Sequence, residues 1–600
     1  MIIAGIFGSK KNQHHDVKKK LDTLVGLQSL SEIKTIDGDF YSVAMGSKYV
    51  QNQSQICLFQ NEKHKKFVVG KVFDKNQYQS LQADELEKIS SGQEFVDRYW
   101  GAYVYVSIDE DKQRIEILRD TLGSVSLFYT ELAPGITVFA SELRIITSLF
   151  ESIAYNHDYI YSYLALGTVL TDQTPFERIY SLYPGCQLVL HAQKKYQELV
   201  FDPAKYTQEH SYSPQELHEE IVSRLKKILS SWTEGADGLV LDFSGGTDSS
   251  GLLFCLKELA SENQEIKPIN MYHDNVRSSD ERVHARTIAQ EVGVDLVELD
   301  MGTCLNFDEV EHLPKFPNYP SPSFTAMKAE DQMLKPANKY KNPSLISGHG
   351  GDHIFLCPPP IWSLTDYLVD HGSKGYMNKL QELAMMTRRP FMPLIKDTIK
   401  GFGMYKGVIS YETLSGVHAK KPTWLSQENY DRGLNRSLHP LYQHKSFLSL
   451  PPGKMRLIDG VYSGFATIVD DVRANRGFPM FYPLFSQPML ELAFSIPTYK
   501  TYSQGFNRYP FRRAISDHFG TKNVWRKDKG ETSGIFQKGL EKNAQQVSDL
   551  CTQGYCAQNG LIDAQLAKSH LYSVMGGNID RQWSLTYLAT IELFLKCWEK

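Results

Sequence analysis

The chain has 600 residues and a mass of 68.3 kDa, and because a single hydrophobic core stops growing at about 250–300 residues, we expect at least two domains. Its 65 Lys and Arg residues nearly balance 69 Asp and Glu residues, which excludes a strongly basic nucleic-acid-binding protein. Hydrophobic residues make up 42% of the chain, which excludes an intrinsically disordered protein. Eight dispersed cysteines without a CxxC pair, and the lack of an apolar run of about 18 residues, predict a cytoplasmic chain with reduced thiols and no membrane-spanning helix.

Residues 1 to about 205 are predicted to be rich in β-strands. Short runs of Val, Ile, Tyr and Phe, such as Lys66–Phe73 and Ala102–Ser107, alternate with polar turns. Residues Met1–Gly8 carry no basic region, so they predict a buried first strand rather than a signal peptide. The polar segment at about Asp202–Tyr212 is predicted to connect two domains.

From residue 206 onwards, strands are predicted to alternate with helices. A capping box at Ser213–Glu216 begins a helix, and a second box is predicted at Ser278 and Glu281, with Gly293 ending that helix. Apolar strands are predicted at Leu239–Phe243, Ile269–Tyr272 and Asp295–Leu299. This alternation is typical of a doubly wound parallel sheet, and residues beyond about 360 are predicted to be mostly helical.

The turn between the first of these strands and the next helix, residues 244–250, has the sequence Ser-Gly-Gly-Thr-Asp-Ser-Ser. Gly245 and Gly246 allow the backbone to approach a ligand closely, and a helix N-terminus favours a bound anion. Asp248 would repel a phosphate but suits Mg²⁺ that bridges phosphates. A Walker loop is excluded by the spacing. The alternative is a serine-rich turn that only caps the helix.

This turn resembles the PP-loop of ATP pyrophosphatases, and the order of motifs along the chain resembles the asparagine synthetase family. The further matching motifs are Trp100–Tyr103, Arg119–Gly123, Phe139–Leu143, Leu182–Gly185, Ser347–Asp352 and Phe478–Phe485. The resemblance implies a glutaminase-like, Ntn-hydrolase-like β-rich sandwich at residues 1–205. It also implies an ATP-dependent synthetase domain with a doubly wound parallel sheet and many helices at residues 206–600.

Family members that hydrolyse glutamine carry an N-terminal nucleophilic Cys followed by Gly-Ile, whereas this chain has Ala4-Gly5-Ile6. A methyl group cannot replace a thiolate nucleophile, so we predict that the first domain does not hydrolyse glutamine. Relatives without this Cys, such as β-lactam synthetase, carbapenam synthetase and lasso-peptide cyclases, join a carboxylate to an amine that is already present on the substrate.

The resemblance also implies roles for individual residues. Asp248 and Asp352 match the family's Mg²⁺ ligands, and Lys529 matches its catalytic lysine, although the spacing leaves Lys527 open. His349 stands where family members carry Glu or Tyr, and an imidazole could accept the proton of the attacking ammonium group. The ATP and pyrophosphate site is expected to include Leu241, Ser244, Gly245, Gly246, Thr247, Asp248, Ser249, Ser250, Met271, Ser347 and Gly348. Asp470 and Arg473 lie near a family Asp-Arg pair.

The resulting expectation is an AMP-forming ligase that uses ATP and Mg²⁺ to adenylate a carboxylate and close a lactam, as lasso-peptide macrolactam cyclases do. The expected partners are a peptide or small amino-carboxylate substrate and a precursor-processing protease, with no nucleic acid and no membrane. The alternatives are an asparagine synthetase-like enzyme that uses ammonia, a β-lactam synthetase-like enzyme, and a non-catalytic peptide-binding scaffold.

Overall fold

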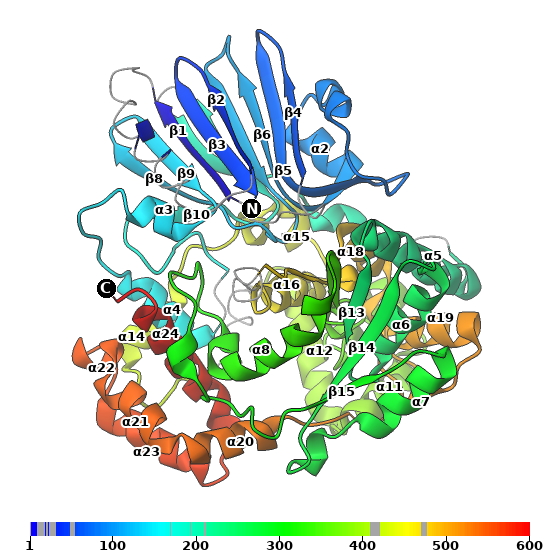
Figure 1. The fold of residues 1–600 in the computed structure, drawn as a ribbon. Helices are drawn as coiled ribbons and strands as arrows, with labels where there is room; N and C mark the ends of the chain where they lie inside the picture. Colours follow the sequence, from blue (N-terminus) through cyan, green and yellow to red (C-terminus); the bar gives the residue numbers. More distant parts are fainter. Residues whose placement is uncertain are drawn as a thin grey trace.

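The computed structural model describes residues 2–8, 18–19, 22, 32–47, 55–167, 170–191, 194–208, 212–408, 420–469, 477–527 and 529–599. The predicted Asp-Arg pair at Asp470 and Arg473 lies outside these residues. Figure 1 shows sheets from the first third of the chain above a larger, mostly helical part that contains a second kind of sheet. None of the described helices is both long and apolar enough to cross a membrane.

Two antiparallel six-stranded sheets form the first part, in the orders β10-β8-β9-β1-β3-β2 and β12-β11-β7-β6-β5-β4. Their strands are β1 (Ile2–Gly8), β2 (Glu32–Asp37), β3 (Tyr41–Ser47), β4 (Gln55–Gln60), β5 (His64–Asp74), β6 (Tyr99–Asp109), β7 (Arg114–Arg119), β8 (Phe128–Ala133), β9 (Ile136–Ala140), β10 (Tyr180–Ser181), β11 (Cys186–His191) and β12 (Lys194–Leu199). Apolar residues of both sheets, among them Ile3, Val43, Phe67 and Val104, share one buried cluster. The predicted β-rich sandwich is confirmed.

Strand β1 is the predicted first strand, and it is central in its sheet. It pairs with β3 on one side and with β9 on the other, so that Ala4 lies between Ala44 and Ala140. Ile3 packs between the two sheets, whereas the Ala4 side chain points the other way, into a cluster with the helices behind the sheet. This alternation follows from the two-residue period of a strand.

The second part is built on a five-stranded parallel sheet of order β15-β14-β13-β16-β17. Its strands are β13 (Gly238–Asp242), β14 (Glu265–Tyr272), β15 (Val297–Asp300), β16 (Pro343–Ser347) and β17 (Met480–Phe481). The predicted parallel sheet is confirmed. The chain moves outward from β13 to one edge and then returns to β16 on its other side, so the loops after β13 and β16 flank a topological switch point, where α/β sheets bind ligands.

Helices cover both faces of this sheet. Leu239 and Leu241 of β13 pack into the cluster that includes helices α5, α6 and α7, whereas Val240 packs against α8. The helices before residue 350 are α2 (Gly92–Arg98), α3 (Leu143–Thr147), α4 (His157–Leu166), α5 (Pro214–Thr233), α6 (Thr247–Leu259), α7 (Arg282–Val292) and α8 (Met327–Leu334). This two-sided cover explains why the neighbouring strands β13 and β16 are buried on both faces, whereas the edge strand β15 alternates apolar and acidic residues.

The remainder of the chain is mostly helical, as predicted. Its helices are α9 (Gly351–Ile354), α10 (Ser363–His371), α11 (Tyr376–Thr387), α12 (Phe391–Tyr405), α14 (Gln427–Leu434), α15 (Lys445–Leu448), α16 (Pro452–Ala466), α18 (Gln487–Ser495), α19 (Tyr509–Phe519), α20 (Ser533–Lys542), α21 (Ala544–Gln553), α22 (Tyr555–Gln558), α23 (Ala564–Met575) and α24 (Gln582–Lys596). Figure 1 shows α20 to α23 at the lower left, and α24 above them beside α4.

The two predicted capping boxes have different outcomes. At the start of α5, the Ser213 Oγ accepts the Glu216 N–H at 3.3 Å and the Glu216 carboxylate accepts the Ser213 N–H at 2.7 Å, so this box is confirmed. The box at Ser278 and Glu281 is wrong: α7 begins one turn later, with Glu281 as an N-cap that makes no side-chain cap. Both side chains are bonded instead to a segment near residue 530.

The predicted connector contains a short 3₁₀ helix, Pro203–Tyr206. Buried contacts join the segments on its two sides: the Lys71 Nζ donates to the Trp232 carbonyl at 3.0 Å, and the Thr121 hydroxyl donates to Gln487 at 2.7 Å. One apolar cluster includes Trp100 from the sandwich and α5 and α6 from the second part. The division into domains at residue 205 stays a prediction.

Candidate active site

The loop after β13 combines a tight glycine turn with the start of α6. Gly245 has a φ of 68°, and Gly246 is the N-cap of α6 without a side-chain cap. The Gly246 N–H donates to the Ser244 Oγ at 3.1 Å, while the Ser250 Oγ is buried and has no hydrogen-bond partner in the described part of the chain. Helix N–H groups that lack a side-chain cap favour an anion, so the loop has the geometry of the predicted phosphate site.

Two other hydroxyl groups of this loop have partners within the protein. The Ser249 Oγ lies 3.4 Å from the Ser244 Oγ. The Thr247 Oγ1 donates to the Val524 carbonyl at 3.5 Å, so Thr247 ties the start of α6 to the segment after α19. The Ser249 Oγ also donates to the Gly246 carbonyl at 3.4 Å, so the hydroxyl groups of Thr247 and Ser249 are both bonded within the loop region.

A second loop, Ser347–Asp352, leads out of β16. Because β16 runs parallel to its neighbour β13, both loops lie at the carboxyl ends of the strands. Gly348 lies against the backbone of Ser249. A Cβ atom at Gly351 would stand 2.3 Å from the carboxyl carbon of Asp248, a distance that admits no side chain. The glycines of this loop therefore allow the two loops to meet, which the sequence motif alone does not reveal.

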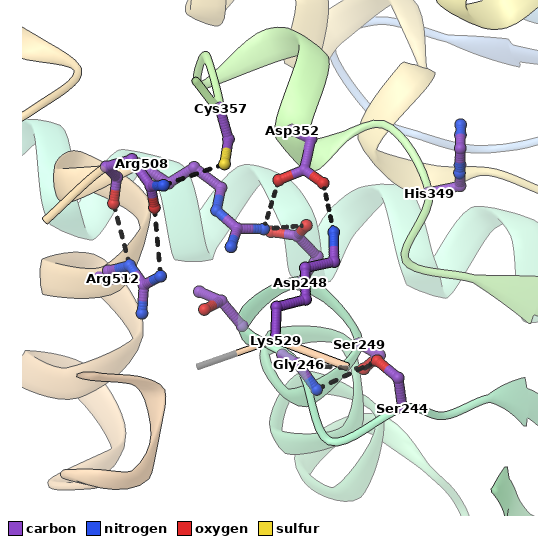
Figure 2. Close-up of polar contacts among 12 residues, drawn as sticks. Ser244, Gly246, Asp248, Ser249, His349, Asp352, Cys357, Arg508, Arg512 and Lys529 are labelled. Atoms are coloured by element: carbon purple, nitrogen blue, oxygen red, sulfur yellow. Dashed lines mark hydrogen bonds and ion pairs between the residues drawn. The ribbon is translucent and has the colours of Figure 1, made fainter. Parts of the chain in front are cut away.

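Asp248 and Asp352, the predicted metal ligands, face each other across these loops and share a cation that the sequence did not predict (Figure 2). The Arg508 Nη1 lies 2.6 Å from the Asp248 Oδ2 and 2.8 Å from the Asp352 Oδ1. The Lys529 Nζ lies 2.8 Å from the other oxygen of Asp352. Two carboxylates and two cations thus form one charged cluster, in which the Arg508 side chain is 8% exposed.

The pKa values in this cluster follow from burial and from neighbouring charge. Burial raises the pKa of Asp248 to about 6, with Asp352 adding to the shift and Arg508 opposing it. Burial also opposes ionisation of Asp352, but the charges of Arg508 and Lys529 hold its pKa below the ordinary value. Against the effect of its own burial, Lys529 has a raised pKa because of the Asp352 carboxylate. Asp352 and Lys529 therefore form a charged pair at neutral pH.

The two carboxylates fit a hard divalent cation such as Mg²⁺. The Asp248 Oδ1 is buried and has no hydrogen-bond partner among the described residues, so it offers an acceptor that nothing in the protein uses. The described residues contain no group of three or more His, Cys, Asp or Glu side chains that could hold a metal. A Mg²⁺ ion usually takes only one or two carboxylates and completes its shell with phosphate oxygens and water, so a pair is sufficient for this ion.

The structure distinguishes the two candidate lysines by their surroundings. Lys529 contacts Asp352, as described, whereas the Lys527 Nζ lies 4.6 Å from the centre of the Phe506 ring. Residue 528 lies outside the described residues. The geometry brings Lys529, and not the Lys527 amine, into the carboxylate cluster.

His349 lies in the second loop, but its ring is exposed and stands apart from the four charged side chains in Figure 2. Its ring centre is 5.5 Å from that of His353 and 6.2 Å from that of Phe485. His349 is therefore placed beside an aromatic and imidazole group, and its role as a base stays a prediction.

Leu241 and Met271 lie on neighbouring strands that lead towards the site. The Leu241 side chain is fully buried in the core, so only its backbone could face a ligand. Met271 is the second-last residue of β14. It is partly buried and packs against the apolar cluster that includes Val240 and α8. The contact of both residues with adenine stays a prediction.

Two family models match the chain over long segments. The glutamine amidotransferase domain matches residues 87–201, and asparagine synthase matches residues 236–598, more than half of the chain. The chain belongs to the asparagine synthase family. The predicted membership is confirmed, and this family is one of ATP-dependent, amide-forming ligases.

Individual relatives of this asparagine synthase family member are distant. The chain is 22% identical over 326 residues to the microcin J25-processing protein McjC of Escherichia coli, covering 54% of this chain and 53% of that protein. It is 21% identical over 318 residues to amidase chry2 of Gibberella zeae, covering 48% and 46%. The chain thus spans about half the length of these curated relatives. A Bacillus subtilis glutamine phosphoribosylpyrophosphate amidotransferase structure gives a TM-score of 0.23 at 12% identity, covering 50% of this chain and 91% of that one.

The position of Ala4 bears on the glutaminase-like part of this asparagine synthase family chain. Ala4 is 1% exposed, and its backbone belongs to a strand that continues in both directions. All eight cysteines are free, and of the two in the sandwich, Cys186 is buried with a raised pKa, which follows from burial. Cys57 lies at the start of the edge strand β4, and burial raises its pKa too. Neither thiol has the lowered pKa that marks a nucleophile.

Sequence reasoning missed two residues of this region, Arg508 and Glu281. Arg508 is the N-cap of α19 with a φ of 50°, and the printed sequence around it carries no recognised motif. Its partner Asp248 lies 260 positions away, so only the packing of α19 against α5 and α6 brings the two together. For Glu281 a signal existed but was assigned to a local capping box.

Proposed function

We propose that the protein is an ATP-dependent ligase that activates a carboxylate as an acyl-adenylate and joins it to an amine. The observation that carries the proposal is a charged cluster beside the N-terminus of α6, which has no side-chain cap. The cluster consists of Asp248, Asp352, Arg508 and Lys529. A carboxylate is a poor acyl donor, and adenylation converts its oxygen into a good leaving group. The site offers what the transfer requires, namely phosphate-binding N–H groups and fixed positive charge.

Each group has a distinct task in this proposal. The N–H groups in the first turn of α6, at residues 247–249, bind the phosphates. Asp248 and Asp352 would hold Mg²⁺, which would neutralise charge on the phosphates as a Lewis acid. A substrate carboxylate oxygen attacks the α-phosphorus, and the bond to pyrophosphate breaks. Lys529 and Arg508 stabilise the negative charge that develops on the departing pyrophosphate and on the acyl oxygen. The amine then attacks the acyl carbon, AMP leaves, and the amine loses a proton.

We further propose that the amine belongs to the substrate itself and that the product is a lactam of a peptide. Two observations support this. Ala4 stands where glutamine-hydrolysing relatives carry their nucleophile, and one relative is named a microcin J25-processing protein. A ring closure between an N-terminal amine and an Asp or Glu side chain, as in lasso-peptide cyclases, requires the amine and the acyl carbon to be held about 3–3.5 Å apart.

The test is incubation of the purified protein with ATP, Mg²⁺ and a peptide that carries a free N-terminal amine and an internal Asp or Glu. The expected result is pyrophosphate release together with a peptide that has lost one water, both abolished by EDTA. ATP-dependent amidation of free aspartate by ammonia, with no peptide turned over, would contradict the lactam. No binding of an ATP analogue in a calorimetric titration would contradict the ligase and favour a non-catalytic scaffold.

A further inference from the structure

Hydrogen bonds and an ion pair connect the segment that carries Lys529 to the turn before α7. The Glu281 Oε1 accepts the Gly530 N–H at 3.1 Å and is also paired with the Arg526 guanidinium. One step further, the Glu531 N–H donates to the Ser278 carbonyl at 2.8 Å, and the Ser278 Oγ donates to the Glu531 carbonyl at 3.3 Å. Contacts thus flank Lys529 on both sides, and Glu281 makes two of them.

The segment around Gly530 packs closely against Glu281. A Cβ atom on Gly530 would stand 2.9 Å from the Glu281 Cγ, so a larger residue at position 530 would displace the Glu281 side chain. The Glu281 and Arg526 side chains are 16% and 10% exposed. An ion pair this well buried leaves an uncompensated charge when one partner is removed, and such losses are much larger than those at exposed pairs.

The same first turn of α7 also contacts the phosphate loop. The Glu281 carbonyl accepts the Ala285 N–H at 3.0 Å, and a Cβ atom on Gly245 would stand 2.7 Å from that same Ala285 nitrogen. The helical turn at residues 281–285 therefore contacts the phosphate loop through its backbone. The Glu281 side chain at its start contacts the segment around Lys529.

We propose that Glu281 is a positioning residue that sets the distance between Lys529 and the phosphate loop. The proposal rests on the role of Lys529 in the proposed function. Glu281 would touch neither ATP nor the acyl group and would act through Arg526 and the Gly530 N–H. This use of the carboxylate explains why it does not cap its own helix.

The test combines amide hydrogen exchange with kinetics on the full chain. In Glu281→Ala, exchange in a peptide covering residues 526–532 is expected to rise by about 10-fold or more, because the Gly530 N–H loses its acceptor. The turnover rate kcat for peptide cyclisation is expected to fall about 100-fold, the usual cost of displacing a reacting group by about 1 Å, while the KM for ATP changes less than about threefold. Glu281→Gln keeps an acceptor for Gly530 and is expected to recover part of kcat.

Gly530→Ala disturbs the same contact from the other side without removing a charge, and it should reproduce both effects. Glu298→Gln is the matched control, because Glu298 pairs with Arg286 on the exposed side of α7. Unchanged exchange in both Glu281→Ala and Gly530→Ala, or an equal rise in exchange throughout the chain, would overturn the proposal. If the wild-type protein does not turn over ATP, the proposed function fails, but the exchange measurement still decides whether Glu281 holds the loop.

Discussion

The centre of strand β1 and the loops after β13 and β16 are the two places where this family's chemistry is expected, and they are built in opposite ways. Around Ala4 the side chains are apolar and the strand is paired on both edges. Around Asp248 the side chains are charged, and one buried carboxylate oxygen has no partner in the described part of the molecule. A site that binds a charged ligand keeps polar groups that the fold does not use, whereas the position of the missing nucleophile is packed as core.

The largest effect is expected at the carboxylate pair. Asp248→Ala removes the unpartnered acceptor and half of the proposed metal site, so pyrophosphate release should fall by about 1,000-fold. A coupled pyrophosphate assay measures this, and Glu298→Gln, which breaks an ion pair with Arg286 outside the carboxylate cluster, is a reference for general damage. Normal pyrophosphate release by Asp248→Ala would contradict the assignment.

The two lysines provide the next comparison. Lys529→Ala should lower amide formation by about 100-fold, since it removes one charge that stabilises the transition state. Lys527→Ala should lower it by less than about threefold, because the Lys527 amine lies over the Phe506 ring rather than in the cluster. Single-turnover measurements with the peptide separate the chemical step from product release. Equal losses in the two variants would remove the geometric distinction between them.

A pH effect on stability is expected where the two parts of the molecule meet. His439 is fully buried, its Nε2 donates to the Pro184 carbonyl at 2.8 Å, and its Nδ1 accepts the Leu441 N–H at 3.1 Å. This neutral form is held by burial, which lowers the pKa of His439 to about 4 from 6.5. Since the folded protein binds fewer protons than the unfolded chain between these values, the free energy of unfolding should fall by about 3 kcal/mol as the pH drops from 6.5 to 4.

The melting temperature Tm, followed from pH 7 to pH 4.5, measures this effect. His439→Gln should be less stable at pH 7 but should lose less on acidification than the wild-type protein. His444→Gln is the control, because the His444 side chain is 51% exposed in the same segment. An equal acid loss in the His439 and His444 variants would exclude His439 as the cause.

The smallest effect is expected from restoring the missing nucleophile. Ala4→Cys adds a sulfur atom to a packed core and should cost about 1–3 kcal/mol of stability. It should not produce glutamate from glutamine, because the residue lies within a paired strand among apolar side chains. Steady glutamate formation by Ala4→Cys, or by the wild-type protein, would contradict this prediction. It would show that the glutaminase-like part can still hydrolyse glutamine.

The elements with a local signal could be predicted from the sequence. The strand predicted at Leu239–Phe243 is observed at Gly238–Asp242, one residue earlier, and the Ser213–Glu216 box is observed where predicted; both depend on neighbouring residues. The partners of the site could not be predicted in this way. Arg508 reaches Asp248 across 260 positions, and Glu281 reaches Arg526 across 245. Such pairs depend on how α19 and the segment after it pack, and for Glu281 that packing overrides the local capping pattern.

The most direct test of the central claim is the fate of the carboxylate oxygen. A peptide whose Asp or Glu side chain carries ¹⁸O in both carboxylate oxygens is incubated with the protein, ATP and Mg²⁺, and the nucleotide product is analysed by mass spectrometry. An acyl-adenylate transfers one of these oxygens to the nucleotide, so the expected product is AMP that contains one ¹⁸O atom for each lactam formed. Lactam formed with unlabelled AMP, or with ADP and labelled phosphate, would contradict it.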